Sequence, residues 1–496
     1  MLKRFFCLFI ALMLPCIALA EYTMAGFDSE NTYRDWNNNL FFQRMEEMTG
    51  VTFTYQQYKT AESWAQAKNQ MTAGDENLPD VLFKAELTHA ETIDLLDRGV
   101  LVDLKPYLAE CCPNLTAILD SNPEYWDAIT LPDGRIGALP YISEQPLQNA
   151  VWLNQGWLDY LKLPMPTTAE ELTTVLRAFL ERDPNQNARA DEIPLTFIGS
   201  FDLKFLGHAY GLVANDYNIF VENDEVRFMP LEENFRPFIQ WLHDLYAEGL
   251  IDRDGFNTSD TLRTISDADS TNTYGGAITT MISNFLPSEW MTSYNLMQPL
   301  TYEGQQVYRC FLGHVLGGTF AVTTNCENVE EMLRWADLFY TEEVSILGTV
   351  GQENVDYVID GDGTWRLTDS TQNNTSFSGD VTIYSGGTTP GISNDSFQQR
   401  FTEAAVRHVS TQAASINAIA ERPFPYYALT YAQQEEIAPL QRSIGVYVDT
   451  CMARWVLGEV EINDETFAEF EQTLKELGLD DFMAFWQNIY DTQCKD

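Results

Sequence analysis

The fold is decided by a short apolar run, Pro79-Asp80-Val81-Leu82-Phe83, which has the length and composition of a buried strand. Helical patterns flank this run at residues 63–73, which end at Gly74, and at residues 90–98, which end at Gly99. Strands that alternate with helices predict an α/β fold, with a parallel sheet covered by helices on both faces.

The same alternation begins further upstream. Strand patterns occupy residues 22–27 and 51–58, and a helical pattern at residues 35–49 ends at Gly50. Ligands of parallel sheets bind at the carboxyl ends of the strands. The segments that follow Phe27 and Phe83 are therefore predicted to lie near a binding site.

A second unit starts near Gln148. A strand pattern at residues 150–154 and a helical pattern at residues 156–162 precede Thr168 and Glu171, which have the spacing of a capping box. Later helices are expected at residues 230–248, 329–340, 397–420, 431–458 and 464–490, and strands at 276–283, 317–323, 355–358 and 365–367. The sheet patterns restart on either side of residues 143–150 and 310–323, where crossings between two lobes are predicted.

The N-terminus has the features of a secretory signal peptide at residues 1–20. Lys3 and Arg4 precede an apolar run at residues 5–17, and Ala18-Leu19-Ala20 forms a small-residue cleavage site. Cleavage after Ala20 is favoured over lipid anchoring at Cys16, because a proline precedes that cysteine. No later stretch is long and apolar enough to span a bilayer. The protein is expected to be exported, to the periplasm or the extracellular space.

The chain is strongly acidic, with 73 Asp and Glu residues against 29 Lys and Arg and a net charge of −44. Loss of Lys3 and Arg4 with the signal peptide would bring the charge to −46. Such a surface repels nucleic acid and anionic membranes. We expect no nucleic-acid partner and a neutral ligand.

Six cysteines follow the signal peptide, which in an exported chain indicates disulfides, although six cysteines allow about fifteen connectivities. The pairings Cys310–Cys326 and Cys451–Cys494 are predicted. Cys111 and Cys112 are adjacent, so a bond between them would be strained, and free thiols are an equal alternative.

One loop has the composition of a calcium site. Side-chain oxygens occur at Asp183, Asn185, Asn187, Asp191 and Glu192, and Arg189 would offer its backbone carbonyl. The alternative is an ordinary Asp- and Asn-rich turn. Two departures from the best-known calcium loop are Ala188, where glycine is usual, and Pro194, where a bidentate Glu is usual.

Enzyme motifs are missing. The five histidines do not have the spacing of a zinc protease, and neither a Gly-x-Ser-x-Gly elbow nor a phosphate loop occurs. A glycosidase needs only two carboxylates, which 73 acidic residues cannot exclude. A non-enzyme is favoured.

Several segments together resemble a known family. Residues 152–158, Trp-Leu-Asn-Gln-Gly-Trp-Leu, precede Pro166-Thr167-Thr168, a helix, and then Asp183-Pro184-Asn185. Further family-like segments lie at residues 47–51, 78–81, 99–104, 351–357 and 455–459. In this order they resemble extracellular solute-binding protein family 1 of ABC importers, the oligosaccharide type that includes the calcium-containing alginate-binding periplasmic proteins.

The resemblance implies a two-lobed, periplasmic-binding-protein-like fold with the ligand cleft between the lobes. The expected lobes are residues 21–147 with 312–385, and 148–311 with 386–496. The implied protein is a monomer that captures an oligosaccharide for ABC permease subunits, with a structural Ca²⁺ in one lobe, away from the sugar. Two alternatives are a binder of another solute, such as a peptide or a lipid-like molecule, and a secreted carbohydrate-active enzyme.

Sugar sites combine aromatic platforms with polar groups at the rim. Trp36, Trp290 and Trp365 stand at the ends of elements or in turns, while Lys84 and Glu86 follow the strand that ends at Phe83. Asn284 and Phe285 follow the strand at residues 276–283, where related binding proteins often carry a cleft aromatic. These seven residues are the candidate ligand contacts, and the alternative for each is packing or a solvated loop.

Overall fold

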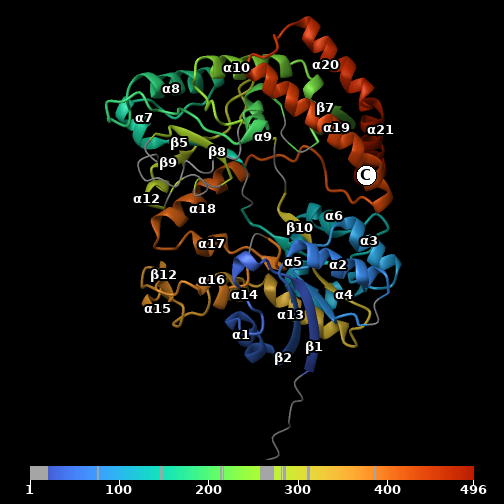
Figure 1. The fold of residues 1–496 in the computed structure, drawn as a ribbon. Helices are drawn as coiled ribbons and strands as arrows, with labels where there is room; N and C mark the ends of the chain where they lie inside the picture. The colour runs from blue at the N-terminus through green and yellow to red at the C-terminus, as the bar shows by residue number, and fades with distance from the viewer. Residues whose placement is uncertain are drawn as a thin grey trace, which may run out of the picture.

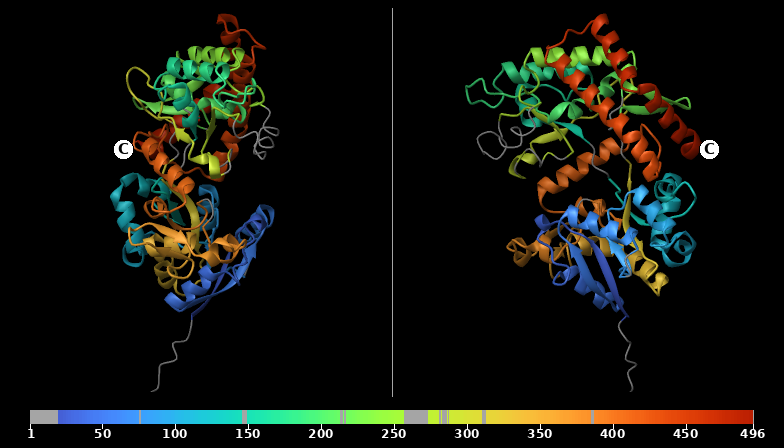
Figure 2. Two further views of the ribbon diagram at one scale, coloured as in Figure 1. Left: turned by 90° about the vertical axis from the view of Figure 1, so that its left-hand side faces the viewer. Right: turned by 45° about the vertical axis from the view of Figure 1, so that its right-hand side comes forward.

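The computed structural model describes residues 20–74, 77–145, 149–212, 215, 217–256, 273–280, 282, 286, 288–309, 313–384 and 387–495. It has two lobes, each built on a β-sheet with helices packed around it, and one lobe lies above the other in Figure 1. The side view in Figure 2 separates the two lobes equally clearly. The predicted two-lobed α/β fold is confirmed.

The first lobe is built on a six-stranded sheet with the order β13-β4-β10-β3-β1-β2. Its strands are β1 (Ala20–Phe27), β2 (Val51–Tyr58), β3 (Val81–Phe83), β4 (Leu139–Ile142), β10 (Val315–Val322) and β13 (Gly391–Ile392). β1 pairs in parallel with β2 and β3, and β13 with β4. β10 is antiparallel to both of its neighbours, β3 and β4.

Helices cover both faces of this sheet. They are α1 (Leu40–Thr49), α2 (Ala61–Thr72), α3 (His89–Asp97), α4 (Lys105–Cys111), α5 (Pro113–Ser121), α6 (Pro123–Ile129), α13 (Val329–Asp337) and α14 (Glu342–Thr349). Successive strand residues point to opposite faces. Phe83 therefore joins the core around Trp335, while Leu82 joins a second core around Trp64. The alternation that predicts strands in the sequence thus builds two separate apolar layers.

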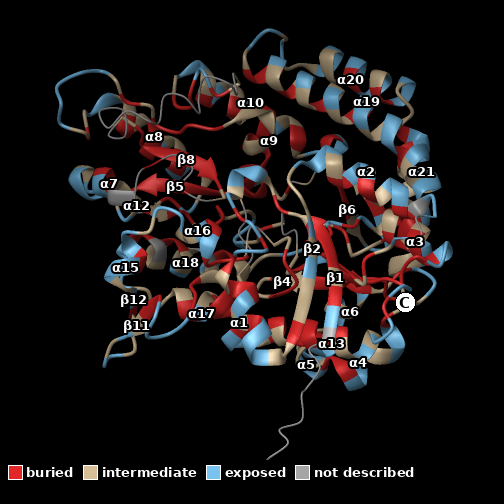
Figure 3. Ribbon diagram, turned by 60° about the horizontal axis from the view of Figure 1, so that its bottom comes forward, coloured by how far each residue is buried: buried red, intermediate tan, exposed pale blue. Residues whose placement is uncertain are grey.

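The second lobe contains a small antiparallel sheet, β8-β5-β9, of β5 (Ala150–Asn154), β8 (Gly276–Thr279) and β9 (Tyr294–Leu296). A hairpin of β6 (Ile219–Glu222) and β7 (Glu225–Phe228) accompanies it. Its helices are α7 (Gln155–Leu161), α8 (Ala169–Glu181), α9 (Gly199–Lys204), α10 (Phe235–Ala247), α12 (Ser288–Met291), α18 (Ala404–Asn417), α19 (Tyr431–Val456), α20 (Asp464–Glu476) and α21 (Leu479–Ile489). β5 and β8 consist mostly of buried residues, whereas exposed residues line the outer face of α7 (Figure 3).

The remaining elements of the first lobe are the hairpin of β11 (Tyr357–Ile359) and β12 (Trp365–Leu367) and the short helices α15 (Asp369–Gln372), α16 (Phe377–Asp380) and α17 (Asp395–Gln398). The division at residue 386 remains a prediction, but β13 pairs with β4 in the first sheet. Residues 391–392 therefore lie in the first lobe, not in the second where the sequence placed them. A two-residue strand in a polar stretch gives no periodic signal.

The cysteine pairing Cys451–Cys494 is wrong, because both are free thiols. The Cys494 thiol lies 3.4 Å from the backbone carbonyl of Tyr426, which precedes α19. Cys451 lies 20 residues along that helix, roughly 30 Å away at 1.5 Å per residue. Cys326, Cys111 and Cys112 are also free thiols, while Cys310 lies outside the described residues.

Residues 1–19 of the predicted signal peptide lie outside the described part of the chain. Within the described part, none of the helices has the length and apolar character needed to cross a membrane.

The chain passes between the lobes before β5, before β10 and after β13. Ligand that bridges the lobes is expected to stabilise a closed arrangement. Small-angle scattering should then show a smaller radius of gyration with ligand than without it. An unchanged profile at saturating ligand would contradict closure.

Candidate functional site

A pocket of about 460 Å³ lies between the two lobes. The first lobe contributes Leu87 and Thr88, which precede α3, and His89, which begins it, together with Gly317 of β10. The second lobe contributes Tyr217, Tyr427, Leu429, Gln434, Ile437, Ala438 and Gln441, the last four from the first half of α19. The pocket therefore depends on how the lobes are placed relative to each other.

The first wall rests directly on β10. The backbone N–H of Leu87 donates to the carbonyl of Gly318 at 3.0 Å, beside an irregularity in the β10–β4 register. Gly318 has φ 76°, and a Cβ there would lie 2.0 Å from the Leu87 carbonyl oxygen. This contact requires glycine. Thr88 then begins α3 with a capping box completed by Glu91.

The second wall is held by a buried tryptophan. Tyr217 stacks on Trp486 with ring centroids 5.1 Å apart, and Tyr427 meets the same ring edge-on at 5.0 Å. α19 begins at a capping box between Thr430 and Gln433, which fixes the turn that presents Gln434. Both aromatic rings are therefore held in position before a ligand binds.

The pocket lining is uncharged at neutral pH. Burial lowers the pKa of His89, and the nearby backbone carbonyls of Ala128 and Tyr427, which favour the charged ring, oppose that shift only in part. The other lining side chains are hydroxyl, amide, aromatic or aliphatic groups. Such a surface suits a ligand that offers hydroxyl groups and apolar faces without formal charge.

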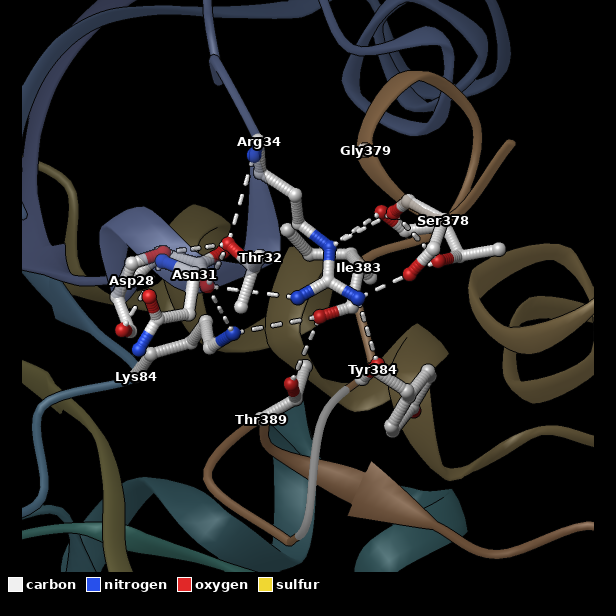
Figure 4. A network of polar contacts seen from close by, with 12 residues as sticks. Asp28, Asn31, Thr32, Arg34, Lys84, Ser378, Gly379, Ile383, Tyr384 and Thr389 are labelled. Atoms are coloured by element: carbon white, nitrogen blue, oxygen red, sulfur yellow. Dashed lines mark hydrogen bonds and ion pairs between the residues drawn. The ribbon is translucent and has the colours of Figure 1, made fainter. Parts of the chain in front are cut away.

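Next to the segment that leads into the first wall, the ends of β1 and β3 lie side by side. Asp28, directly after β1, accepts a hydrogen bond from Trp36 Nε1 at 3.1 Å and forms ion pairs with Lys84 Nζ at 3.1 Å and Arg34 Nη1 at 3.4 Å. Figure 4 shows the side chains of Asp28, Arg34 and Lys84 converging with the backbone of Ser378, Ile383 and Tyr384. We refer to Asp28, Arg34 and Lys84 as the edge network.

The two charged candidates after β3 differ in their environment. Lys84 is 1% exposed, and burial lowers its pKa to about 8. Glu86 is exposed, although partial burial of its carboxyl group raises its pKa. Both have left-handed backbones, with φ 50° and 47°. Lys84 cannot reach a ligand in this conformation, whereas Glu86 remains a candidate contact.

The tryptophan candidates also differ. Trp36 is 1% exposed and packs edge-on against Phe83 at 5.6 Å. Trp365 is 2% exposed and stacks on both Phe397, at 4.7 Å, and Phe401, at 4.1 Å. The prediction that Trp36 and Trp365 are sugar platforms does not fit their burial, because both rings lie in the core. Trp290 on α12 is half-buried, and Asn284 and Phe285 lie outside the described residues.

Replacing Trp365 with alanine is expected to reduce the free energy of unfolding by about 3–5 kcal/mol, because it empties the space between two stacked rings. Ligand affinity should stay within about twofold of wild type, a difference of less than 0.5 kcal/mol. Denaturant unfolding and calorimetric titration measure the two quantities. Loss of affinity at unchanged stability would instead place Trp365 in the binding surface.

The predicted calcium loop has a compact conformation. The Asp183 carboxylate accepts from the backbone N–H groups of Asn187 and Ala188, both at 3.1 Å. The side-chain amides of Asn185 and Asn187 donate to Asp191 at 3.0 Å, which lowers the pKa of that carboxyl group. Ala188 adopts the left-handed conformation of the glycine it replaces, with φ 61°.

Glu192 is the residue of this loop whose environment most clearly favours a bound cation. It is 7% exposed, and its Oε1 has no hydrogen-bond partner among the described residues. Burial raises its pKa first, and the nearby Asp191 and Asp183 charges add to the shift. A buried oxygen among like charges fits a bound cation. Within the described residues, however, no group of three or more His, Cys, Asp or Glu side chains is spaced to hold a metal ion.

Sequence reasoning missed most of the pocket. Four of the lining residues lie far from β3 in the sequence: Tyr217, Tyr427, Gln434 and Gln441. The sequence of α19 has only the pattern of an ordinary helix. The one available signal was position, because Thr88 and His89 follow the segment predicted to lie near the site.

No family model matches the chain. Over 489 residues it is 27% identical to the fructooligosaccharide ABC transporter substrate-binding protein FusA of Streptococcus pneumoniae, covering 92% of this chain and 88% of FusA. The structure of FusA with kestose superposes with a TM-score of 0.69 at 24% identity, over 95% of this chain and 99% of that one.

A human-milk-oligosaccharide-binding solute-binding protein of Bifidobacterium longum infantis superposes with a TM-score of 0.76 at 20% identity, over 97% of this chain and 100% of that one. The alginate-binding protein AlgQ2, solved without calcium ion, superposes at 0.66 and 21% identity, over 95% and 98% of the two chains. The fold is that of the two-lobed solute-binding proteins. The chain is a homologue of FusA, a substrate-binding protein of an ABC transporter.

Proposed function

We propose that this protein captures an oligosaccharide between its two lobes and delivers it to the membrane permease of an ABC importer. The proposal rests on one observation above all, the pocket whose walls come from both lobes and whose lining combines tyrosine rings with hydroxyl and amide groups. Homology to FusA along nearly the whole chain supports the same class of ligand.

The ligand is proposed to be neutral. The lining residues carry no formal charge at neutral pH, and the net charge of −44 disfavours the approach of an anion.

Export through the signal peptide at residues 1–20 belongs to the same proposal. FusA is named as a binding protein, which fits a non-enzyme.

Tyr427→Ala is expected to raise the dissociation constant for the bound oligosaccharide about thirtyfold, since truncating a central aromatic contact costs about 2 kcal/mol. Calorimetric titration should first be run on wild type with fructo-oligosaccharides, neutral glucans, mannans and xylans, and with uronate oligomers. Gln472→Ala is the matched control, because Gln472 is exposed on α20 and outside the pocket lining.

Three outcomes separate the alternatives. Binding of a neutral oligosaccharide without turnover, weakened by Tyr427→Ala and not by Gln472→Ala, supports the proposal. Tight binding of uronate oligomers alone would contradict the neutral ligand. Binding of peptides or lipid-like solutes, or cleavage of the glycan, would replace the proposed function.

We also propose one structural Ca²⁺ held by the side chains of Asp183, Asn185, Asn187, Asp191 and Glu192 with the carbonyl of Arg189. Three carboxylates and three neutral oxygens suit the hardness and coordination number of calcium. The side-chain amides of Asn185 and Asn187 would have to turn so that oxygen replaces nitrogen toward the ion. One structure of FusA is that of an EF-hand mutant in complex with fructo-nystose, and that of AlgQ2 is one without calcium ion.

Removing calcium with a chelator is expected to lower the melting temperature. With a dissociation constant on the order of 10⁻⁴ M, 1 mM calcium stabilises the folded state by about 1.4 kcal/mol. Asp183→Ala should abolish the chelator effect, while Asp480→Ala, an exposed acid on α21, should preserve it. Sugar affinity should not change. Absence of calcium from purified protein, with a melting curve indifferent to chelator, would leave the loop as a turn.

A further inference from the structure

His208, in the second lobe, is a buried histidine whose ring requires a further hydrogen-bond donor. It belongs to the short 3-10 helix η2 (Gly207–Tyr210), is 6% exposed, and has no hydrogen-bond partner for either ring nitrogen among the described residues. Burial lowers its pKa to about 4, although the nearby backbone carbonyl of Phe205 favours the charged ring. The ring is therefore neutral at neutral pH, with one N–H donor and one acceptor nitrogen. A carbonyl can engage only the N–H, so the acceptor nitrogen needs a donor from another group.

The ring of His208 lines a cavity of about 40 Å³. At about 10–15 Å³ for a group of the size of water, this volume accommodates about three non-hydrogen atoms. The cavity shares four lining residues with a larger groove of about 410 Å³: Gly211, Leu212, Tyr302 and Arg309. A groove of this volume is within the range of ligand sites. The small cavity beside it can therefore take a side group of a ligand whose body lies in the groove.

The wall between the cavity and the groove is fixed by close packing. Gly211 has φ 71°, and a Cβ there would lie 2.6 Å from Cε1 of the Tyr302 ring. The Tyr302 hydroxyl accepts from Nδ2 of Asn234 at 2.6 Å. The backbone N–H groups of Tyr302 and Gln305 each donate to the carbonyl of the other at 2.9 Å, which closes the turn between them. These contacts hold the wall in position before a ligand binds.

The chemistry of the groove favours a neutral, hydroxyl-rich ligand. Its lining has a formal charge of −2, from two positive and four negative side chains: Arg227, Arg309, Glu222, Glu232, Glu233 and Glu303. The excess of carboxylates disfavours an anion, and the two guanidinium groups oppose a cation. Guanidinium donors beside carboxylate acceptors match adjacent sugar hydroxyls, each of which both donates and accepts. Leu212 and Phe220 add apolar surface for C–H groups.

We propose that the groove between η2, the β6–β7 hairpin and residues 302–309 is a second carbohydrate site, which holds one hexose unit with its hydroxymethyl group in the cavity. There the hydroxyl of that group donates to the acceptor nitrogen of His208. All the lining residues belong to the second lobe, so this site does not require the two lobes to close. It is separate from the pocket between the lobes and goes beyond the function proposed for that pocket.

Nitrogen-15 NMR of the histidine rings measures both sites in one experiment. His208 reports binding in the second site, while His89 lines the pocket between the lobes and reports binding there. The probes are D-glucose, D-galactose and D-mannose, and at least one of them should shift the His208 resonance saturably. The corresponding pentose, which lacks the hydroxymethyl group, should bind at least about tenfold more weakly, because it offers no donor to His208.

A steric block tests the location of the site. Gln305 is exposed and lines the cavity, so an indole at this position should fill the mouth of the cavity without disturbing the core. Gln305→Trp is expected to abolish the saturable shift at His208. Gln306→Trp is the matched control and should preserve the shift, because Gln306 is equally exposed but lies outside both linings.

Replacement of the ring itself tests the role of His208. In a Tyr427→Ala background, which weakens the pocket between the lobes, His208→Phe should raise the hexose dissociation constant about tenfold in calorimetric titration. Its melting temperature should equal or exceed that of the background, since a phenyl ring needs no donor. His243→Phe is the control, because His243 is half-buried on α10 of the same lobe and outside the groove.

The outcomes for the two sites can be told apart. Absence of a saturable shift at His208 with every hexose, or a shift that survives Gln305→Trp, would overturn the second site. A crystal structure soaked in hexose that shows an ordered water only beside His208 would do the same. If hexoses shift His208 but oligosaccharides leave His89 unmoved, the second site stands and the function proposed for the pocket between the lobes is overturned.

Discussion

The insertion of β10 between β3 and β4 is the constraint on which the rest of the structure depends. β10 enters the first sheet only after the chain has built the three strands of the second-lobe sheet, so each lobe is assembled from separate parts of the sequence. Val315, Ile142 and Ile392 lie level in the sheet, because Ile142 pairs with both of the others. The chain therefore passes between the lobes at one end of the strands. This is also the end of the sheet at which β1 and β3 finish.

Because the crossings between the lobes and the ends of β1 and β3 lie at the same end of the sheet, the pocket and the edge network are neighbours. In a sheet with parallel β1, β3 and β4, the loops after these strands all point toward the second lobe. Apolar side chains fill the two layers on the faces of the sheet, and the polar and charged groups collect at its end. The arrangement leaves a surface that is rigid in its backbone but polar in its side chains, which suits recognition of hydroxyl groups.

The sequence predicted the parts of the fold that depend on local periodicity. The strand at residues 51–58 matches β2 in full, and the run ending at Phe83 contains β3, because apolar alternation and glycine stops are local signals. Prediction from the sequence failed where contacts between residues far apart in the chain decide the structure. The rings that cover Trp365 lie 32 and 36 residues further along the chain, and Cys451 and Cys494 are separated by the length of a helix. β13 is too short to carry a pattern.

The candidate site divides in the same way. Placement of a binding site at the ends of β1 and β3 followed from sheet topology and stays a prediction, although Asp28 and Lys84 do meet there in an ion pair. The wall formed by Tyr217, Tyr427 and α19 depends on packing against Trp486, which no local pattern encodes.

A crystal structure with a bound oligosaccharide tests the account most directly. Sugar density within about 4 Å of both Thr88 and Tyr427 is the result it predicts. Sugar held by one lobe alone, or outside this pocket, would contradict it.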